Sequence, residues 1–185
     1  MLNIPEKYNT LKFIGPTIWD YIFDEWRKGE EYQKSWQEHW EERGYASWNE
    51  WRTAYVAPLQ PEKLEWFLYE ISNPTEILPE FYGVPSKTWV EKAYGGETTK
   101  KLKDIAHLSI IAENEKIKDI IKNFPEETLL TAILQDDKII LVEGMHRANA
   151  LVNWNLPEPP KSKVLLAITE WNKEIPILGS SYKNK

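Results

Sequence analysis

One short stretch of the chain brings together residue types that could bind an anion: Glu143, Gly144, Met145, His146 and Arg147. Four apolar residues precede it and apolar residues recur at helical spacing after it, so the pattern predicts a buried strand, a tight turn and a helix. The first turn of a helix attracts anions through unpaired N–H groups and the helix dipole. An arginine adds a guanidinium that grips phosphate through two parallel hydrogen bonds. The stretch therefore predicts a phosphate site. The alternative is an ordinary connection in which Glu143 caps the helix.

Few other residues have the type and spacing to do chemistry. Arg43 and Arg52 flank an aromatic-rich turn, which would offer a cation and flat rings to a small substrate. The histidines are His39, expected to be solvated, His107, expected to be half-buried in a strand, and His146. None of them has a second ligand at metal spacing, so the sequence predicts no metal site built from protein side chains alone.

The segments around the turn predict a small mixed sheet with helices on it. We expect strands at residues 105–111, 129–134, 139–142 and 164–168, and an amphipathic helix at 114–124. The last of these strands is almost wholly apolar, which is typical of a central strand. A hairpin turn at 135–138 would join the second and third strands.

The N-terminal half has a different pattern. Residues 16–57 predict three helices, with a capping box from Ser47 to Glu50 at the start of the third. The tryptophans at helical spacing are expected to form core rather than ligand contacts; they are Trp19, Trp26, Trp40 and Trp51. Residues 65–71 predict a strand or a short buried helix. We therefore expect an α+β protein with a Trp-rich, mostly helical lobe at 1–100 and an α/β core at 101–185.

Composition limits the class of protein. The 185 residues contain 10 Trp and no Cys, and the net charge is −6. The absence of cysteine fits a reducing compartment, and no signal peptide or membrane-spanning run is visible, so a cytoplasmic protein without membrane contact is expected. Proteins that bind nucleic acid mainly through phosphates need a positive surface, so the negative charge disfavours DNA or RNA as the main partner. The sequence does not indicate an oligomeric state.

The stretch Ile139–Leu151, ILVEGMHRANAL with its flanks, resembles the signature of the ParB/sulfiredoxin-like superfamily, in which a strand runs into a Gly-x-His/Arg-Arg turn and a helix. Within that group it is most similar to the archaeal free-serine kinases. The resemblance covers roughly residues 105–168. Sulfiredoxins have a catalytic cysteine immediately before the His-Arg pair, where this chain has Met145. Because the chain has no cysteine at all, sulfiredoxin chemistry is excluded.

The resemblance implies a fold of this superfamily and a nucleotide, ATP or ADP with Mg²⁺, as ligand. The turn from Gly144 through Met145 and His146 to Arg147 would hold the phosphates, which would also carry the Mg²⁺. Glu143 would contact the metal or the substrate, and His146 lies where it could assist catalysis. The substrate would be a small hydroxyl-bearing compound, and the reaction either phosphoryl transfer or ATP hydrolysis.

The resemblance also implies a catalytic base. In free-serine kinases a glutamate near the junction of the first strand and first helix takes the proton from the attacking hydroxyl. Glu113 aligns with that position, and a slip of the alignment would place Glu115 there instead. The alternative is that this acidic pair, with Asn114, only decorates the start of a helix.

Two other functions stay open at this stage. ParB relatives act on DNA, so a DNA-associated nuclease or NTPase is possible, although the negative charge opposes it. A non-catalytic module that binds a nucleotide or phosphate without turnover is the second alternative, because the N-terminal half departs from the resembled family.

Overall fold

The computed structural model describes residues 2–183 and contains one five-stranded mixed sheet. Its strands are β1 (Leu11–Thr17), β2 (Trp66–Ile71), β3 (Glu127–Gln135), β4 (Lys138–Glu143) and β5 (Lys163–Glu170). They lie in the order β1-β2-β5-β3-β4. Only β3 and β5 are parallel, and the other neighbours are antiparallel. The chain is therefore an α+β protein, as the sequence predicts.

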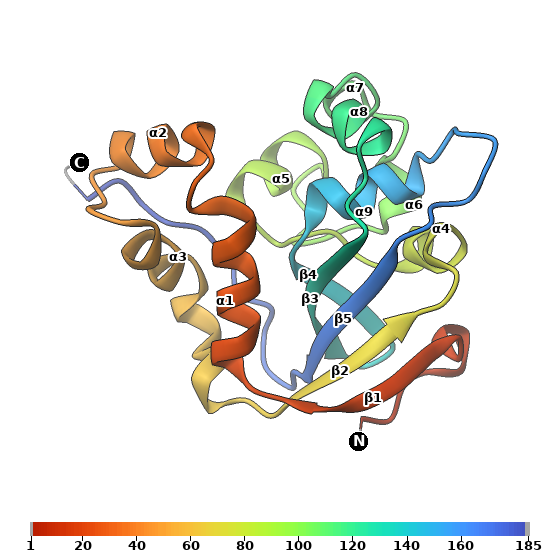
Figure 1. Cartoon of the computed structure of the whole chain (residues 1–185). Helices are drawn as coiled ribbons and strands as arrows, with labels where there is room; N and C mark the ends of the chain where they lie inside the picture. The colour runs from red at the N-terminus through yellow and green to blue at the C-terminus, as the bar shows by residue number, and fades with distance from the viewer. Residues whose placement is uncertain (1, 184–185) are drawn as a thin grey trace.

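Helices cover both sides of this sheet. They are α1 (Trp19–Glu30), α2 (Lys34–Glu42), α3 (Trp48–Val56), α4 (Pro74–Ile77), α5 (Lys87–Lys92), α6 (Leu102–Ile105), α7 (Ser109–Ala112), α8 (Glu115–Lys122) and α9 (Met145–Val152). Short 3₁₀ turns occupy Glu6–Tyr8, Ala57–Leu59, Pro61–Lys63 and Leu78–Glu80. In the view of Figure 1, α1–α3 lie to the left of the sheet, and α4, α6, α8 and α9 lie above it and to its right. No helix among the described residues is long and apolar enough to cross a membrane.

The central strands are buried on both faces. In β3, the residues from Thr128 to Leu134 are all buried, and in β5 those from Val164 to Thr169 are. Continuous burial explains why these segments read as apolar runs rather than as alternating patterns. β5 lies in the middle of the sheet, which confirms the expectation for residues 164–168. The expected strand at 139–142 and the helix at 114–124 are also formed.

The expected strand at residues 105–111 is wrong. This segment forms the short helices α6 and α7 with a turn between them. A strand would place residues 105, 107, 109 and 111 on one face, but Ile105 and Ile111 are buried while His107 and Ser109 are exposed. Burial every three residues is helical rather than extended spacing.

The sheet takes strands from both sides of the boundary expected at residue 100. β1 and β2 come from the N-terminal side, and β2 pairs with β5 from Phe67 opposite Ile168 to Ile71 opposite Val164. The segment at 65–71 is thus a strand, not a buried helix. The N-terminal half therefore supplies two strands to the sheet as well as the expected helices.

The three expected helices within residues 16–57 are confirmed. The Ser47 side chain accepts a hydrogen bond from the Glu50 N–H at 3.2 Å and so caps α3. Glu50 bonds back to the Ala46 N–H at 2.9 Å, one residue earlier than a standard capping box. Trp26, Trp40 and Trp51 are buried and Trp19 is partly buried, so these rings form core as expected.

The helical lobe is joined to the sheet by two hydrogen bonds from aromatic side chains. The indole N–H of Trp26 on α1 donates to the Thr131 hydroxyl of β3 at 2.9 Å. The Tyr55 hydroxyl of α3 donates to the Val142 carbonyl at the end of β4 at 2.9 Å. Both acceptors lie near the point where the sheet meets the turn before α9. These bonds fix α1 and α3 close to that turn.

Gly144 links β4 to α9, and the geometry of the link requires glycine. Its φ is +96°, in the left-handed region that residues with a Cβ disfavour. A Cβ built there would lie 2.4 Å from Cδ2 of Leu130, a residue with no exposed surface. Glycine therefore permits both the bend and the close contact with β3.

We predict that Gly144→Ala destabilises the protein by roughly 2–5 kcal/mol, because about 1–2 kcal/mol arises from the left-handed backbone and about 1–3 kcal/mol from overpacking. Urea denaturation measures the free energy of unfolding. Gly15→Ala is the control, since its Cβ would meet nothing within 4 Å and its φ is not in the left-handed region. Equal effects of the two substitutions would contradict this interpretation of Gly144.

Candidate functional site

The turn after β4 lines a cleft of about 860 Å³. One wall of the cleft comes from α1, α2 and the loop between them, and the other comes from α8 and the ends of β3 and β4. All five residues from Glu143 to Arg147 line it. The residues that the sequence singled out as an anion site therefore meet in one open cavity of ligand size.

The start of α9 presents free backbone donors. The helical hydrogen bonds begin with the Ala148 N–H, which bonds to the Gly144 carbonyl at 2.8 Å. The N–H groups of Met145, His146 and Arg147 thus lie in the first turn, where no intrahelical carbonyl is available. The helix dipole adds partial positive charge at the same place. Met145 itself is only 5% exposed, so it offers its backbone rather than its side chain.

The Arg147 guanidinium is held by two partners inside the cleft. It donates to the Thr128 hydroxyl at 2.7 Å and to the Glu143 carboxylate at 2.5 Å. Both side chains of the ion pair are partly shielded from solvent. Glu143 therefore orients Arg147, rather than capping α9; Gly144 occupies the N-cap position.

His146 lies in the cleft as a neutral side chain. Its ring contacts the Trp89 ring edge to face, with centroids 5.9 Å apart. Burial, together with the nearby charges of Lys116 and Arg147, lowers the pKa of His146 to about 4. A neutral imidazole can donate or accept a hydrogen bond, but at neutral pH it adds no positive charge for a phosphate.

Lys116 on α8 is a cleft residue that the sequence did not single out. Its ammonium lies 4.1 Å from the centre of the Trp36 ring of α2, on the opposite wall. Partial desolvation lowers the pKa of Lys116, and the carboxylates of Glu30 and Glu143 oppose that effect. Lys116 is therefore a second cation that faces the same space as Arg147.

Arg52 is not free to bind a substrate, contrary to the role expected for it. Its guanidinium is buried and donates to both carboxylate oxygens of Glu30, with the Nε bond at 2.7 Å. The same carboxylate accepts the indole N–H of Trp48 at 2.8 Å. Four aromatic rings surround the guanidinium within 5.6 Å of its carbon, those of Trp26, Trp36, Trp51 and Tyr55. Of Arg52 and Glu30, only Glu30 lines the cleft.

Arg43 is also absent from the cleft lining. It donates to the ring nitrogen of His39 at 3.0 Å and lies over the Tyr182 ring at 5.2 Å. His39 is half-buried between Trp36 and Trp51, not solvated as expected. Arg43 therefore joins α2 to the C-terminal segment.

Glu113 does not lie in the cleft. It is exposed at the C-terminal end of α7, and Glu115 is exposed and ion-paired with Lys118 at 2.7 Å. The expected position of Glu113 depends on a strand at residues 105–111, and that strand is not formed. Asn114 instead caps α8, because its side chain accepts from the Ile117 N–H at 3.2 Å. The alternative interpretation of this acidic pair as part of a helix start therefore fits the geometry.

Sequence reasoning missed several residues that line this cleft. They are Glu30, Trp36, Lys116 and Thr128. Among the described residues, no group of three or more His, Cys, Asp or Glu side chains is arranged to hold a metal ion. His107 is exposed in the turn between α6 and α7, not half-buried in a strand.

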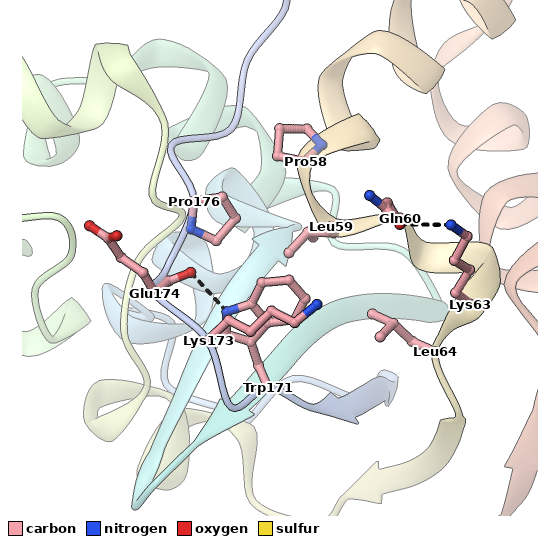
Figure 2. Close-up of a pocket in the computed structure, with 9 residues that line it drawn as sticks. All are labelled: Pro58, Leu59, Gln60, Lys63, Leu64, Trp171, Lys173, Glu174 and Pro176. Atoms are coloured by element: carbon pink, nitrogen blue, oxygen red, sulfur yellow. Dashed lines mark hydrogen bonds between the residues drawn. The ribbon is translucent and has the colours of Figure 1, made fainter.

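A second pocket, of about 380 Å³, lies between the segment after α3 and the segment after β5 (Figure 2). Its Trp171 is 7% exposed and donates to the Glu174 carbonyl at 3.1 Å, and Lys63 donates to Gln60 at 2.9 Å. These polar groups bond to one another within the pocket. It contains none of the residues singled out from the sequence, and we assign it no role.

Comparisons with protein-family models, with curated proteins and with solved structures found no match to this chain. No relative therefore assigns a role to the cleft residues, and their chemistry is inferred from their own types, contacts and charges.

Proposed function

We propose that the protein binds ATP or ADP with Mg²⁺ in this cleft and transfers a phosphoryl group to a small hydroxyl-bearing compound. The observation that carries the proposal is that the whole turn from Glu143 to Arg147 lines one cleft together with Lys116. The resemblance to the ParB/sulfiredoxin-like superfamily points the same way, since the free-serine kinases hold phosphate at the corresponding turn. We include membership of that superfamily in the proposal.

Arg147 is the main phosphate ligand in this proposal. A guanidinium has five N–H donors, and Thr128 and Glu143 use two of them. The others remain for a ligand, while the two bonds keep the planar group in a fixed orientation. Pre-oriented donors lose less entropy on binding than free side chains do. The first-turn N–H groups of α9 would add neutral donors beside it.

The charge of the cleft supports a metal-bound nucleotide rather than a bare phosphate. Five acids face three cations: Glu25, Glu30, Asp119, Glu127 and Glu143 against Lys28, Lys116 and Arg147. Mg²⁺ is usually held by one or two carboxylates together with phosphate oxygens and water. In this proposal the phosphate oxygens would carry the ion, which leaves Glu143 to contact the substrate. When bound, the ion would neutralise phosphate charge that these carboxylates would otherwise repel.

The protein's contribution to phosphoryl transfer would be positioning and charge neutralisation. Glu143 replaces Glu113 as the proposed base, because it lies in the cleft and Glu113 does not. Neutral His146 would act as a hydrogen-bond partner that orients the substrate hydroxyl. The adjacent helical lobe, with Trp26 and Trp36 on its cleft wall, would limit access of water.

We predict that Arg147→Gln weakens binding of ADP with Mg²⁺ about 10- to 150-fold, because a charge-assisted contact is worth about 1.5–3 kcal/mol. Isothermal titration calorimetry measures the affinity, and the rise in melting temperature with ADP should shrink in parallel. Arg43→Gln, the same change outside the cleft, should leave both unchanged. Equal binding by the wild type and Arg147→Gln would exclude Arg147 as the phosphate ligand.

We predict that Glu143→Gln lowers kcat for phosphate transfer about 10²- to 10⁴-fold, the usual contribution of a general base. A coupled assay with ATP, Mg²⁺ and serine as the first hydroxyl substrate measures the rate. Glu113→Gln and Glu115→Gln are matched controls and should keep wild-type rates. Loss of activity in Glu113→Gln with full activity in Glu143→Gln would return the role of base to Glu113.

A non-catalytic nucleotide-binding module is the second candidate. The observation in its favour is that the Glu143 carboxylate, the proposed base, is already engaged by Arg147. Nucleotide binding by the wild type without transfer to any small hydroxyl compound and without ATP hydrolysis would select this candidate. The acidic majority in the cleft argues against the DNA-associated alternative, which salt-dependent retention on DNA would revive.

A further inference from the structure

The contact between Lys116 and Trp36 spans the cleft from one wall to the other. Trp36 is carried by α2 and Lys116 by α8, and both side chains line the cavity. The ammonium lies 4.1 Å from the ring centre, which is a close cation–π distance. A flat ring and a cation therefore face each other across the same space.

The Trp36 ring is held in place by contacts with other side chains of α2 and α3. Its ring packs against the Trp51 ring with centroids 5.5 Å apart and against His39 with centroids 5.6 Å apart. The Arg52 guanidinium lies 5.6 Å from the ring centre and is itself fixed by Glu30. These contacts tie Trp36 to buried groups, whereas it stays partly exposed toward the cleft. A ligand would meet Trp36 as a preformed flat surface.

Lys116 is free to change partners. Among residues 2–183 it forms no ion pair within 4 Å, unlike Lys28, which pairs with Glu25 at 2.5 Å. A cation–π contact near solvent is weaker than a charge-assisted hydrogen bond to phosphate. The lysine stem is long and flexible, so its ammonium can leave the ring without moving the backbone. A phosphate held by Arg147 would therefore draw Lys116 away and uncover Trp36.

We propose that Trp36 is the stacking surface for the base of the bound nucleotide, and that Lys116 exchanges its contact with Trp36 for one with the phosphates. The inference rests on the proposed nucleotide binding and adds the base subsite. Stacking on an aromatic ring accepts any nucleobase, because every base has a flat π-face. The site would thus bind a nucleoside polyphosphate more tightly than the polyphosphate alone.

The test compares ATP with inorganic tripolyphosphate, each with Mg²⁺, by isothermal titration calorimetry. Trp36→Leu should weaken ATP about 5- to 150-fold, since stacking is typically worth about that factor per base, and should not weaken tripolyphosphate. Lys116→Met should weaken both ligands. Trp36→Phe keeps a flat ring and should retain most ATP affinity. The control is Trp154→Leu, which removes an indole outside the cleft and should change neither affinity.

Each other outcome contradicts a stated part of the account. If Trp36→Leu weakens both ligands equally while remaining folded by circular dichroism, or weakens neither, Trp36 is not a base-stacking surface. If the wild type binds tripolyphosphate as tightly as ATP, the base subsite is absent although phosphate binding stands. If the wild type binds neither ligand, the proposed function fails, and the base subsite with it.

Discussion

The ion pair between Glu30 and Arg52 is the contact on which the cleft wall depends. Removing two charges from water is costly, and a buried pair is stable only when its geometry and further hydrogen bonds compensate. Here Arg52 donates to both Glu30 oxygens, Trp48 adds an indole N–H, and aromatic rings surround the guanidinium. Loss of one partner from such a pair typically costs about 3–5 kcal/mol, because the other charge is left buried.

This pair connects the core of the helical lobe to the cleft. Glu30 ends α1, Arg52 belongs to α3, and the guanidinium contacts Trp36 of α2, so one buried contact holds three helices together. Trp26 and Tyr55, which surround the same guanidinium, bond to β3 and to the end of β4. The helical lobe is therefore fixed to the edge of the sheet from which the turn at Gly144 begins. The two walls of the cleft consequently keep a defined spacing.

Local patterns explain which features the sequence could predict. A buried strand, a glycine and a helical restart lie within a few residues around Gly144, so periodicity alone predicts that strand–turn–helix unit. The cap at Ser47 is equally local. The strand prediction for residues 105–111 was wrong because apolar residues at intervals of three fit a short helix as well as a strand. A window this short does not distinguish the two. The wrong strand assignment also gave a wrong expected position for Glu113, which does not line the cleft.

The remaining parts of the site depend on contacts between distant segments. Lys116 meets Trp36, and Thr128 meets Arg147, only because the tertiary fold brings α8 beside α2 and β3 beside α9. Nothing near Lys116 in the sequence distinguishes it from other lysines on an amphipathic helix. Arg52 was misjudged for a related reason, since its partner Glu30 lies in another helix and no local pattern predicts the pairing. Long-range contacts of charged side chains are thus the information that the sequence did not reveal.

A crystal structure of the protein grown with ADP and Mg²⁺ tests the central claim most directly, because it locates the ligand without relying on turnover. The account predicts that the phosphates lie within hydrogen-bond distance of the Arg147 guanidinium and of the first-turn N–H groups of α9. Nucleotide bound elsewhere, for example in the pocket beside Trp171, or a cleft that stays free of nucleotide at saturating ADP, would contradict it.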